Sequence, residues 1–360
     1  GLGLFYGGYP ITPASDILHT LAAWKHLGIK TFQAEDEIAG IGSVIGAAFV
    51  GNLGITATSG PGIALKSEAL GLAIIAELPL VVINVQRGGP STGLPTKTEQ
   101  SDLLQAMYGR NGEAPMPVIA SATPGDCFFV AYEACRIAVK YMTPVMLLND
   151  GYLANGSEPW QVPKLDDLKD FDVTFADESN LIDGQFMPYT RDKKTLARPW
   201  AIPGTEGLEH RIGGIEKEDL TGNVSYDPDN HHYMVATRAK KIEAIANEFD
   251  PLEIFGNASG DLLILSWGGT KGSCRSAVET LQTDGQKVSH VHLRWVNPFP
   301  NDLGEILIKF KNVLIPEINY GQLIKMIRSE FLIDAKGLNQ VRGKPISSSD
   351  IQKAAKDLIG

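Results

Sequence analysis

Residues 54–85 read GITATSGPGIALKSEALGLAIIAELPLVVINV, and this stretch indicates the fold class. Two apolar runs, 54–58 and 80–85, flank a segment at 63–76 that has the composition of a buried helix. Strands that are apolar on both faces are typical of parallel sheets covered by helices. The stretch therefore predicts a strand, helix, strand unit in a parallel sheet.

The same alternation extends outward over residues 30–148. We expect further strands at 31–33, 118–121 and 144–148, and helices at 38–50, 99–107 and 126–140. Pro124 and Gly125 precede the last helix, where a helix start tolerates them. Residues 1–155 are thus expected to form an α/β domain with a mostly parallel sheet.

Beyond residue 155 the periodicity stops. Prolines, glycines and aspartates dominate residues 156–232, which predicts a long irregular arm, and a helix is expected at 235–248 to complete a middle segment at 156–250. Such an arm is expected to contact a partner, because alone it buries too little surface to offset its ordering entropy.

A second alternating set predicts a smaller α/β domain at 251–360. Its expected elements are a strand at 262–266, a helix from 273, a strand at 288–293, a helix at 303–309, a strand at 313–316 and a helix from 322. This domain shows no catalytic constellation of its own, so we expect it to serve packing between subunits.

Composition excludes several classes of function. The 360 residues include 42 acids and 32 bases, for a net charge of -10, which argues against a nucleic acid or an anionic membrane as partner. The longest apolar run, 70–85, is interrupted by Glu77 and Pro79 and is too short to cross a bilayer. Cys127, Cys135 and Cys274 are too scattered for a disulfide framework and are expected to be buried thiols of a cytoplasmic protein.

Two glycine motifs are incomplete. Residues 60–67 resemble a phosphate-binding loop, but Leu65 stands where that loop needs a glycine. Residues 40–46 are one residue too long for the dinucleotide fingerprint, so we expect Gly42 and Gly46 to allow close helix packing instead. Neither ATP nor NAD is supported.

The histidines do not predict a metal site on this chain. His290 and His292 alternate onto one strand face, but no third ligand stands nearby in sequence, which favours a structural role. His231 and His232 follow several polar residues and are expected in a solvated turn.

Three loops at expected strand ends carry polar residues, and ligands of parallel sheets bind at such ends. The first, Tyr9-Pro-Ile-Thr-Pro, presents Thr12 between two prolines; the second places Glu35, Asp36 and Glu37 at a helix start; the third, residues 86–97, begins with Gln86-Arg87. One acid suits a helix start, whereas three repel one another. An arginine at a strand end suits a carboxylate. These residues predict either a site for a small anion or a structural loop network.

At these residues the sequence resembles the 2-oxoacid:ferredoxin oxidoreductases. Tyr9-Pro-Ile-Thr-Pro-Ala-Ser resembles their pyrimidine-domain signature, and residues 37–48 resemble the segment with their thiamine-activating glutamate. Residues 87–103 resemble the α subunit of the 2-oxoglutarate branch (2-oxoglutarate synthase), as do 207–211, 226–232 and 316–323. The resemblance covers nearly the whole chain. It implies a thiamine diphosphate-binding pyrimidine-domain fold, followed by a smaller transketolase C-terminal-like α/β domain.

The resemblance also implies an activity and site residues. Members of this branch convert 2-oxoglutarate and coenzyme A to succinyl-CoA and carbon dioxide and reduce ferredoxin, reversibly. Glu37 would activate thiamine diphosphate at its pyrimidine ring, with Asp36 as the next candidate, and Thr58 and Gly60 would contribute to cofactor binding. Glu35 and Asp36 would be helix-start acids.

The substrate would be bound by the first and third loops. Arg87 would pair with the 1-carboxylate of the 2-oxoacid, and Thr12 would hydrogen-bond the same end. Ser91, Thr92 and Lys97 lie in the loop that could meet a distal carboxylate.

The chain lacks both the Gly-Asp-Gly pattern with a following Asn that holds magnesium and diphosphate in thiamine enzymes, and a cysteine set for a cluster. The resemblance therefore implies a β subunit with the magnesium, the diphosphate site and an iron-sulfur cluster, without which this chain would be inactive. It also implies a γ domain, ferredoxin as electron acceptor and a dimer of heteromers. Gly1 is no initiator Met and starts no signal peptide, which fits loss of the γ domain or of several residues of a first helix.

Three alternatives stay open. The chain could belong to a pyruvate or branched-chain 2-oxoacid enzyme, or to a transketolase-like thiamine enzyme, although residues 87–103 argue against the latter. It could also be a non-catalytic assembly subunit, against which the presence of both Glu37 and Arg87 argues.

Overall fold

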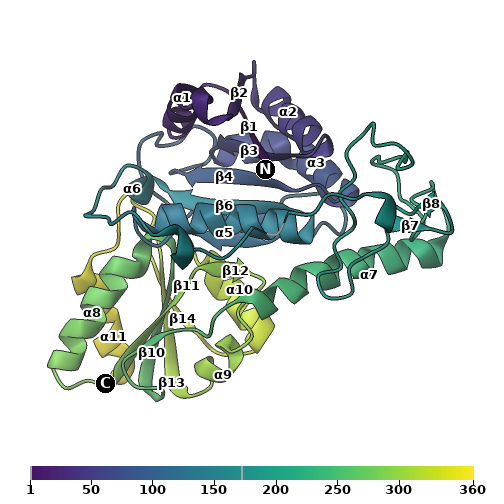
Figure 1. Cartoon of the computed structure of the whole chain (residues 1–360). Coiled ribbons are helices and arrows are strands. Elements are labelled where there is room, and N and C mark those ends of the chain that lie inside the picture. The colour runs from purple at the N-terminus through teal and green to yellow at the C-terminus, as the bar shows by residue number, and fades with distance from the viewer. Residues whose placement is uncertain (1, 172) are drawn as a thin grey trace.

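The computed structural model describes residues 2–171 and 173–360 and contains two large sheets, each covered by helices (Figure 1). The first sheet has seven strands in the order β12-β5-β6-β4-β3-β1-β2, and every pair is parallel except β12 with β5. Its strands are β1 (Gly3–Gly8), β2 (Lys30–Gln33), β3 (Asn52–Thr58), β4 (Leu80–Gln86), β5 (Val118–Ala120), β6 (Pro144–Asp150) and β12 (Trp295–Asn297).

Helices cover both faces of this sheet. Side chains of α2 (Glu37–Phe49), α3 (Gly60–Ala76) and α4 (Leu103–Tyr108) pack on one face, and those of α1 (Ser15–Ala23) and α5 (Asp126–Tyr141) on the other. The central strands are therefore apolar toward both sides, as in residues 80–85, and each fully buried Val, Leu or Ile contributes about 1.5–3 kcal/mol. The predicted fold class and the five predicted strands of this sheet are confirmed.

Close packing of α2 on the sheet depends on strand glycines. A Cβ atom added to Gly7 would lie 2.8 Å from the Gly40 carbonyl oxygen, and one added to Gly54 would lie 2.8 Å from the Val44 carbonyl oxygen. The prediction that Gly42 and Gly46 provide the close contact is wrong, because a Cβ on either would meet nothing within 4 Å. The glycines that matter face the helix from the strands below it.

The second sheet has five strands in the order β14-β13-β10-β11-β9. Its strands are β9 (Ile254–Phe255), β10 (Gly260–Trp267), β11 (Val288–Leu293), β13 (Phe310–Glu317) and β14 (Lys336–Asn339), and its helices are α8 (Lys271–Thr283), α9 (Leu303–Leu307), α10 (Gln322–Phe331) and α11 (Ser348–Ile359). Helices α8 and α11 pack on one face and α9 and α10 on the other. The second predicted α/β set is confirmed, with β9, β14 and α11 as additions.

The two halves share one core. Val82 and Met146 of the first sheet belong to the same buried apolar cluster as Leu263, Trp267 and Val291 of the second. Strand β12 strengthens this connection, because it follows β11 in the chain but pairs with β5 of the first sheet.

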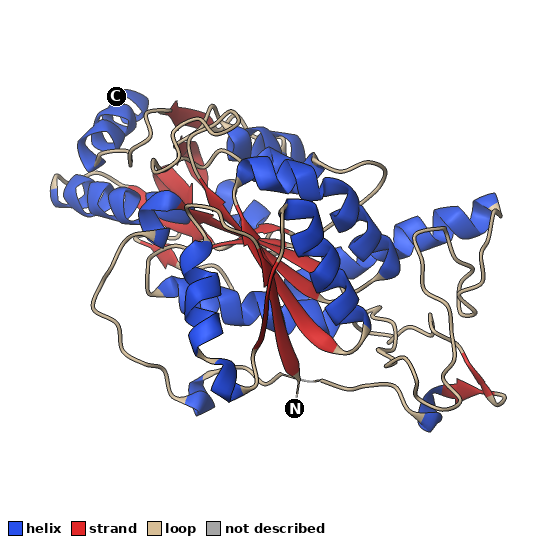
Figure 2. Cartoon of the chain, turned by 90° about the horizontal axis from the view of Figure 1, so that it is seen from above, coloured by secondary structure: helices blue, strands red, loops and turns tan. Residues whose placement is uncertain are grey.

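Between the two halves runs the arm, from the short helix α6 (Gly151–Ala154) to the long helix α7 (Pro228–Ala244). The arm holds the small ribbon of β7 (Leu181–Ile182) and β8 (Gln185–Phe186), and Figure 2 shows it outside the main body. The predicted irregular arm is confirmed. Single 3-10 turns complete the chain at Lys25–Leu27, Leu165–Asp167, Glu178–Asn180, Ile245–Glu248 and Gly268–Thr270. Among the described residues no helix is long and apolar enough to span a bilayer.

Helix α7 begins earlier than predicted. The Asp227 side chain caps it by accepting a hydrogen bond from the Asn230 N–H at 2.7 Å. His231 and His232 therefore lie in the first turns of a helix; they are exposed to solvent as predicted, but the prediction of a turn is wrong. The His231 Nδ1 lies 2.7 Å from a carboxylate oxygen of Glu216 in the arm.

A buried carboxylate fastens the arm to the first sheet. Glu77 is fully buried at the end of α3, and its oxygens accept hydrogen bonds from both terminal nitrogens of Arg191, at 2.8 and 2.6 Å, and from Lys241 Nζ at 2.5 Å. Burial by itself would raise the pKa of Glu77, but Lys241 and Arg191 hold that pKa well below its usual range. The arm and α7 thus meet at one ionised side chain.

We predict that Glu77→Gln lowers the free energy of unfolding by about 3–5 kcal/mol, because two buried cations lose their carboxylate. Urea denaturation at neutral pH measures the loss, and limited proteolysis shows whether the arm is released. The contribution of Glu77 is present above the ordinary glutamate pKa and is lost as the pH falls below it. The control is Glu279→Gln, which breaks the exposed pair with Arg275 and should cost no more than about 0.5 kcal/mol. Equal effects of the two substitutions would contradict the anchoring role.

Candidate functional site

The three loops singled out in the sequence lie at one edge of the first sheet. Tyr9 follows β1, Thr58 ends β3, and Arg87 follows β4, while Glu37 opens the helix after β2. Because these strands run parallel, their carboxyl ends meet at the same edge, which is where ligands bind in open α/β sheets.

Tyr9, Thr58 and Glu37 converge over the first turn of α3. The Tyr9 hydroxyl lies 2.6 Å from Thr58 Oγ1. A Cβ added to Gly62 would lie 1.8 Å from Thr58 Oγ1, 2.6 Å from the Tyr9 hydroxyl and 3.1 Å from Glu37 Cγ. Burial, together with the Glu37 carboxylate, raises the pKa of Tyr9. A neutral phenol therefore stands beside the carboxylate.

The acids at the start of α2 have separate positions. Asp36 caps the helix, because its carboxylate accepts the Ala39 N–H at 2.8 Å, and this confirms its predicted helix-start role. Glu35 is exposed and precedes the cap, so it takes no part in the helix. Glu37 is half-buried and is the acid that faces the Tyr9 and Thr58 hydroxyls. Because Asp36 already caps the helix, the Glu37 carboxylate remains available to a ligand.

Arg87 is a buried cation with an unused donor. It is 7% exposed, and its Nε is buried without a hydrogen-bond partner among the described residues. Ser59 Oγ and Asn84 Oδ1, at or near the ends of the adjacent strands, are likewise buried and unpartnered there. Buried polar groups are costly when they lack partners, so this arrangement suits residues that complete their hydrogen bonds with a bound ligand.

The space beside Gly60 is filled by another side chain of the protein and is not open to a ligand. A Cβ at this position would lie 2.7 Å from a carboxylate oxygen of Asp102. Burial raises the pKa of Asp102, while the Asn84 amide hydrogen bond and Arg87 oppose that rise. The small residue at 60 thus admits Asp102 next to the end of β3.

Residues 88–97 form a closed loop at the rim. The Leu94 N–H donates to the Gly88 oxygen at 2.8 Å, and the Gly88 N–H to the Lys97 oxygen at 3.0 Å. Gly93 has φ +46°, and a Cβ there would lie 2.1 Å from the Gly88 oxygen, so only glycine fits. The side chains of the predicted substrate-binding residues Ser91, Thr92 and Lys97, and of Thr12 in the first loop, are exposed.

Buried polar residues that the sequence pattern does not reveal fasten this loop to the second half. Thr98 Oγ1 donates to Asp150 Oδ1 at 2.8 Å, and the Gly269 N–H donates to Asp150 Oδ2 at 2.8 Å. Gln100 donates to the Trp267 oxygen at 2.7 Å and accepts the Ile318 N–H at 3.0 Å. The prediction of a helix over 99–107 is wrong for residues 99–102, among which Gln100 makes two of these bridges, and α4 begins only at Leu103. A polar residue at the end of an apolar strand, such as Asp150, was the available signal.

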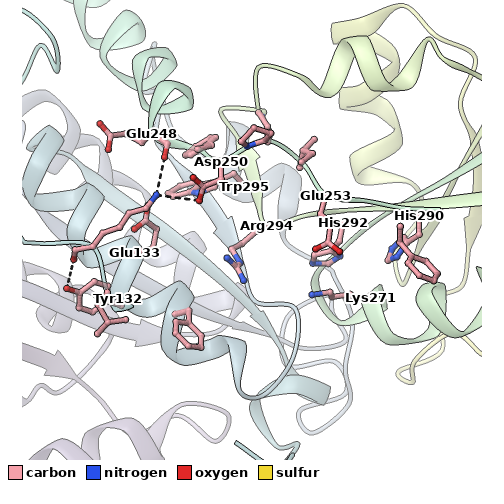
Figure 3. A pocket seen from close by; sticks show the side chains of 18 of the residues that line it. Tyr132, Glu133, Glu248, Asp250, Glu253, Lys271, His290, His292, Arg294 and Trp295 are labelled. Atoms are coloured by element: carbon pink, nitrogen blue, oxygen red, sulfur yellow. Dashed lines mark hydrogen bonds and ion pairs between the residues drawn. The ribbon is translucent and has the colours of Figure 1, made fainter. Parts of the chain in front are cut away.

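A pocket of about 370 Å³ lies elsewhere, between the two halves (Figure 3). Lys271, His290 and His292 lie on one side of it, and Tyr132 and Glu133 on the other. None of the predicted site residues lines it. It is therefore separate from the edge that carries Glu37 and Arg87.

The two histidines of this pocket contact the same buried serine hydroxyl. Ser266 Oγ lies 2.7 Å from His290 Nε2 and 2.8 Å from His292 Nδ1, so the two rings share one hydroxyl. Burial lowers the pKa of His290 to about 3 and that of His292 well below its usual value, which keeps both rings neutral. All three cysteines are free thiols, and in the part of the chain described no three His, Cys, Asp or Glu residues gather as metal ligands. A structural role for this pair stays a prediction, because His292 Nε2 is buried without a hydrogen-bond partner among the described residues.

Family comparison covers nearly the whole chain. Residues 2–226 match the family described as pyruvate flavodoxin/ferredoxin oxidoreductase, thiamine diphosphate-binding, and residues 260–351 match pyruvate:ferredoxin oxidoreductase core domain II. The 2-oxoglutarate oxidoreductase subunit KorA of Mycobacterium tuberculosis is 53% identical over 98% of this chain, which spans 53% of that relative.

Solved structures agree with this relationship. The 2-oxoglutarate:ferredoxin oxidoreductase from Magnetococcus marinus, with 2-oxoglutarate, coenzyme A and succinyl-CoA bound, matches with a TM-score of 0.93 and 36% identity, covering 100% of this chain and 62% of that one. A split-gene transketolase matches at a TM-score of 0.53 and 11% identity over 99% of this chain and 91% of its own, which shows a shared fold only. The chain thus spans 53% of the M. tuberculosis subunit and 62% of the M. marinus chain.

We predict that Gly62→Ala lowers the free energy of unfolding by about 1–3 kcal/mol, because its methyl group would overlap the buried Thr58 and Tyr9 hydroxyls. The matched control is Gly42→Ala, also in a helix, where open space surrounds the new methyl group and better helix propensity should add about 0.5–1 kcal/mol. Thermal unfolding of both variants checks the opposite signs. A stable Gly62→Ala protein would show that the three side chains do not meet as described.

Proposed function

Because the chain belongs to the pyruvate flavodoxin/ferredoxin oxidoreductase family, we propose that it is the α subunit of a 2-oxoacid:ferredoxin oxidoreductase that acts on 2-oxoglutarate. The proposed reaction converts 2-oxoglutarate and coenzyme A to succinyl-CoA and carbon dioxide, with ferredoxin as the electron acceptor, and is reversible. The relative from M. tuberculosis is named for 2-oxoglutarate, and the M. marinus enzyme contains it, which supports this substrate over pyruvate.

One observation carries the proposal: a half-buried carboxylate stands at the same sheet edge as a buried arginine whose Nε has no hydrogen-bond partner among the described residues. The Glu37 carboxylate suits the aminopyrimidine of thiamine diphosphate. The Ser59 and Asn84 oxygens, which are buried without partners among the described residues, leave polar positions nearby for such a ring. When bound, the cofactor supplies a carbon nucleophile and an electron sink for decarboxylation.

In this proposal Glu37 holds a proton at a pyrimidine ring nitrogen. Its position next to the neutral Tyr9 phenol, with Asp36 engaged in the helix cap, makes Glu37 the acid for this task. Thr58 keeps the Tyr9 hydroxyl in place through their 2.6 Å contact and so shapes the wall of the cofactor site. Gly60 contributes by admitting Asp102 rather than by cradling the cofactor directly.

Arg87 is proposed to bind the 1-carboxylate of the 2-oxoacid. A planar guanidinium can bind a carboxylate through two hydrogen bonds, and burial strengthens such a pair by excluding water. Thr12, exposed at the neighbouring loop, would add a hydrogen bond to the same end of the substrate. Fixing the substrate in this way brings its oxo carbon to the reacting position.

The remaining parts of the enzyme are proposed to come from partners. The described residues hold no metal-ligating cluster, and the three cysteines cannot ligate an iron-sulfur cluster. We assign magnesium, the diphosphate site and the cluster to a β subunit, together with a γ domain and ferredoxin, in a dimer of heteromers. Residues 1–155 would carry this chain's share of the site, 251–360 would serve packing, and the arm within 156–250 would contact the β subunit.

We predict that Glu37→Gln abolishes coenzyme A-dependent reduction of a viologen dye by the complex of this chain with its β subunit, lowering kcat by at least about a hundredfold, because the amide cannot hold the proton. The control is Glu35→Gln, which changes an exposed acid two residues away and should retain full activity. Retained turnover in Glu37→Gln would refute the proposed function. Absence of any turnover with several 2-oxoacids, in a complex with an intact cluster, would favour an assembly subunit.

We further predict that Lys97→Ala combined with Thr92→Ala reduces the preference for 2-oxoglutarate over pyruvate by about tenfold in kcat/KM, because a distal carboxylate loses its cation and a hydroxyl donor. The ratio of kcat/KM for the two substrates measures the effect. Because only 2-oxoglutarate has the second carboxylate, pyruvate turnover should stay constant and acts as an internal control. An unchanged ratio would remove these residues from the substrate site.

A further inference from the structure

Lys66 is a buried lysine beneath the candidate site. It lies on α3, is 0% exposed, and its Nζ donates to the main-chain oxygen of Glu37 at 2.5 Å. The same ammonium lies 4.9 Å from the centroid of the Tyr9 ring. Lysine is almost never fully buried without a paired charge, so its position next to these two residues calls for an explanation.

The charge of this lysine costs stability. Burial lowers the pKa of Lys66 to about 8, although Glu37 and Asp36 on α2 oppose the shift; the third titratable neighbour, Tyr9, is neutral. A lowered lysine pKa means that folding disfavours the ammonium. The cost is fully present below about pH 8 and disappears as the pH rises toward the ordinary lysine value. An apolar side chain of similar length would fill the same space without this cost.

The hydrogen bond of Lys66 acts on the backbone of Glu37 and not on its carboxylate. Among the described residues the acceptor of the ammonium is the Glu37 carbonyl, while the Glu37 carboxylate acts on Lys66 through its charge. The first turn of α2 is thereby tied to α3, while the carboxylate stays free to face a ligand. Tyr9, whose ring contacts the ammonium, is held by Thr58 on the other side.

We propose that Lys66 is a positioning residue, which fixes the Glu37 carboxylate and the Tyr9 ring for the cofactor by holding the first turn of α2 through the Glu37 carbonyl. The inference rests on the proposed function, because it gives Lys66 a role only if Glu37 faces the cofactor. A positioning role of Lys66 differs from a structural role in one measurable respect, because loss of the lysine should then reduce turnover without reducing stability.

The test uses the complex of this chain with its β subunit. Lys66→Met should leave the Tm unchanged or raise it, yet lower kcat about tenfold or more with the KM for 2-oxoglutarate within about threefold. Bound thiamine diphosphate should show a weaker near-ultraviolet circular dichroism signal, which reports ring placement independently of turnover. The matched control is Lys241→Met, another buried lysine, which breaks the pair with Glu77 and should lower the Tm by about 5 °C.

The charge-conserving variant Lys66→Arg and the pH dependence of turnover provide a second test. Lys66→Arg keeps a cation and should recover part of the activity lost in Lys66→Met. In the wild type, kcat/KM should fall as the pH rises above about 8, because the neutral amine donates a weaker hydrogen bond to the Glu37 carbonyl and loses its charge over the Tyr9 ring. In Lys66→Arg this fall should move to higher pH. The same alkaline limit in wild type and Lys66→Arg would overturn the proposal.

The remaining outcomes are equally decisive. If Lys66→Met lowers the Tm as Lys241→Met does, with activity lost in proportion to folded protein, the lysine is structural and the proposal is overturned. If Lys66→Met keeps activity within about twofold of wild type, the proposal for Lys66 is also overturned. The proposed function survives that result if Glu37→Gln is inactive in the same assay. If both variants are active, the proposed function and this inference fall together.

Discussion

Parallel strands all end at the same edge of a sheet, and the candidate site depends on this constraint. It brings Tyr9, Thr58 and Arg87 together although they are separated by 49 and 29 residues along the chain. Glu37 reaches the same edge because α2 packs closely enough on β1 and β3, which the bare backbones at Gly7 and Gly54 allow. A larger side chain at either strand position would displace the helix and with it the carboxylate. The direction of the strands determines where the loops meet. The strand glycines determine how closely α2 packs on the sheet, and therefore how far Glu37 extends over the loops.

Buried polar contacts hold the other segments around this edge. Glu77 joins the arm and α7 to the end of α3, and Asp150 with Gln100 joins the loop after β4 to the second half. Apolar packing could hold these segments together equally strongly, but it allows them to slide past one another. A buried carboxylate, in contrast, requires its hydrogen-bond donors at defined positions. The polar bridges therefore contribute chiefly to geometry. Lys66 is the extreme case, because its burial carries a cost and both its hydrogen bond and its cation-π contact involve residues of the site.

The sequence predicts most of the fold and only part of the site. Strands such as 80–85 are visible because burial on both faces makes them continuously apolar, whereas β1 is not predicted, since glycines occupy half of Gly3–Gly8. β12 is also not predicted, because nothing in a three-residue segment reveals that it pairs with β5. At the site, Glu37 and Arg87 stand out through loop composition and family resemblance. Lys66 and Gln100 do not, because their partners lie 29 and 167 residues away and no local spacing encodes them, and Asp150 is marked only by its place at the end of an apolar strand.

The position of β12 has an evolutionary consequence. Strand β5 has β6 on one side, and on the other its backbone groups are covered by three residues that the chain supplies only after completing most of the second sheet. A gene fusion or fission near residue 250 would leave that margin bare and prone to pairing with foreign strands. Recombination between members of such a lineage should therefore exchange both halves as one heritable unit, even though the ribbon diagram suggests two modules.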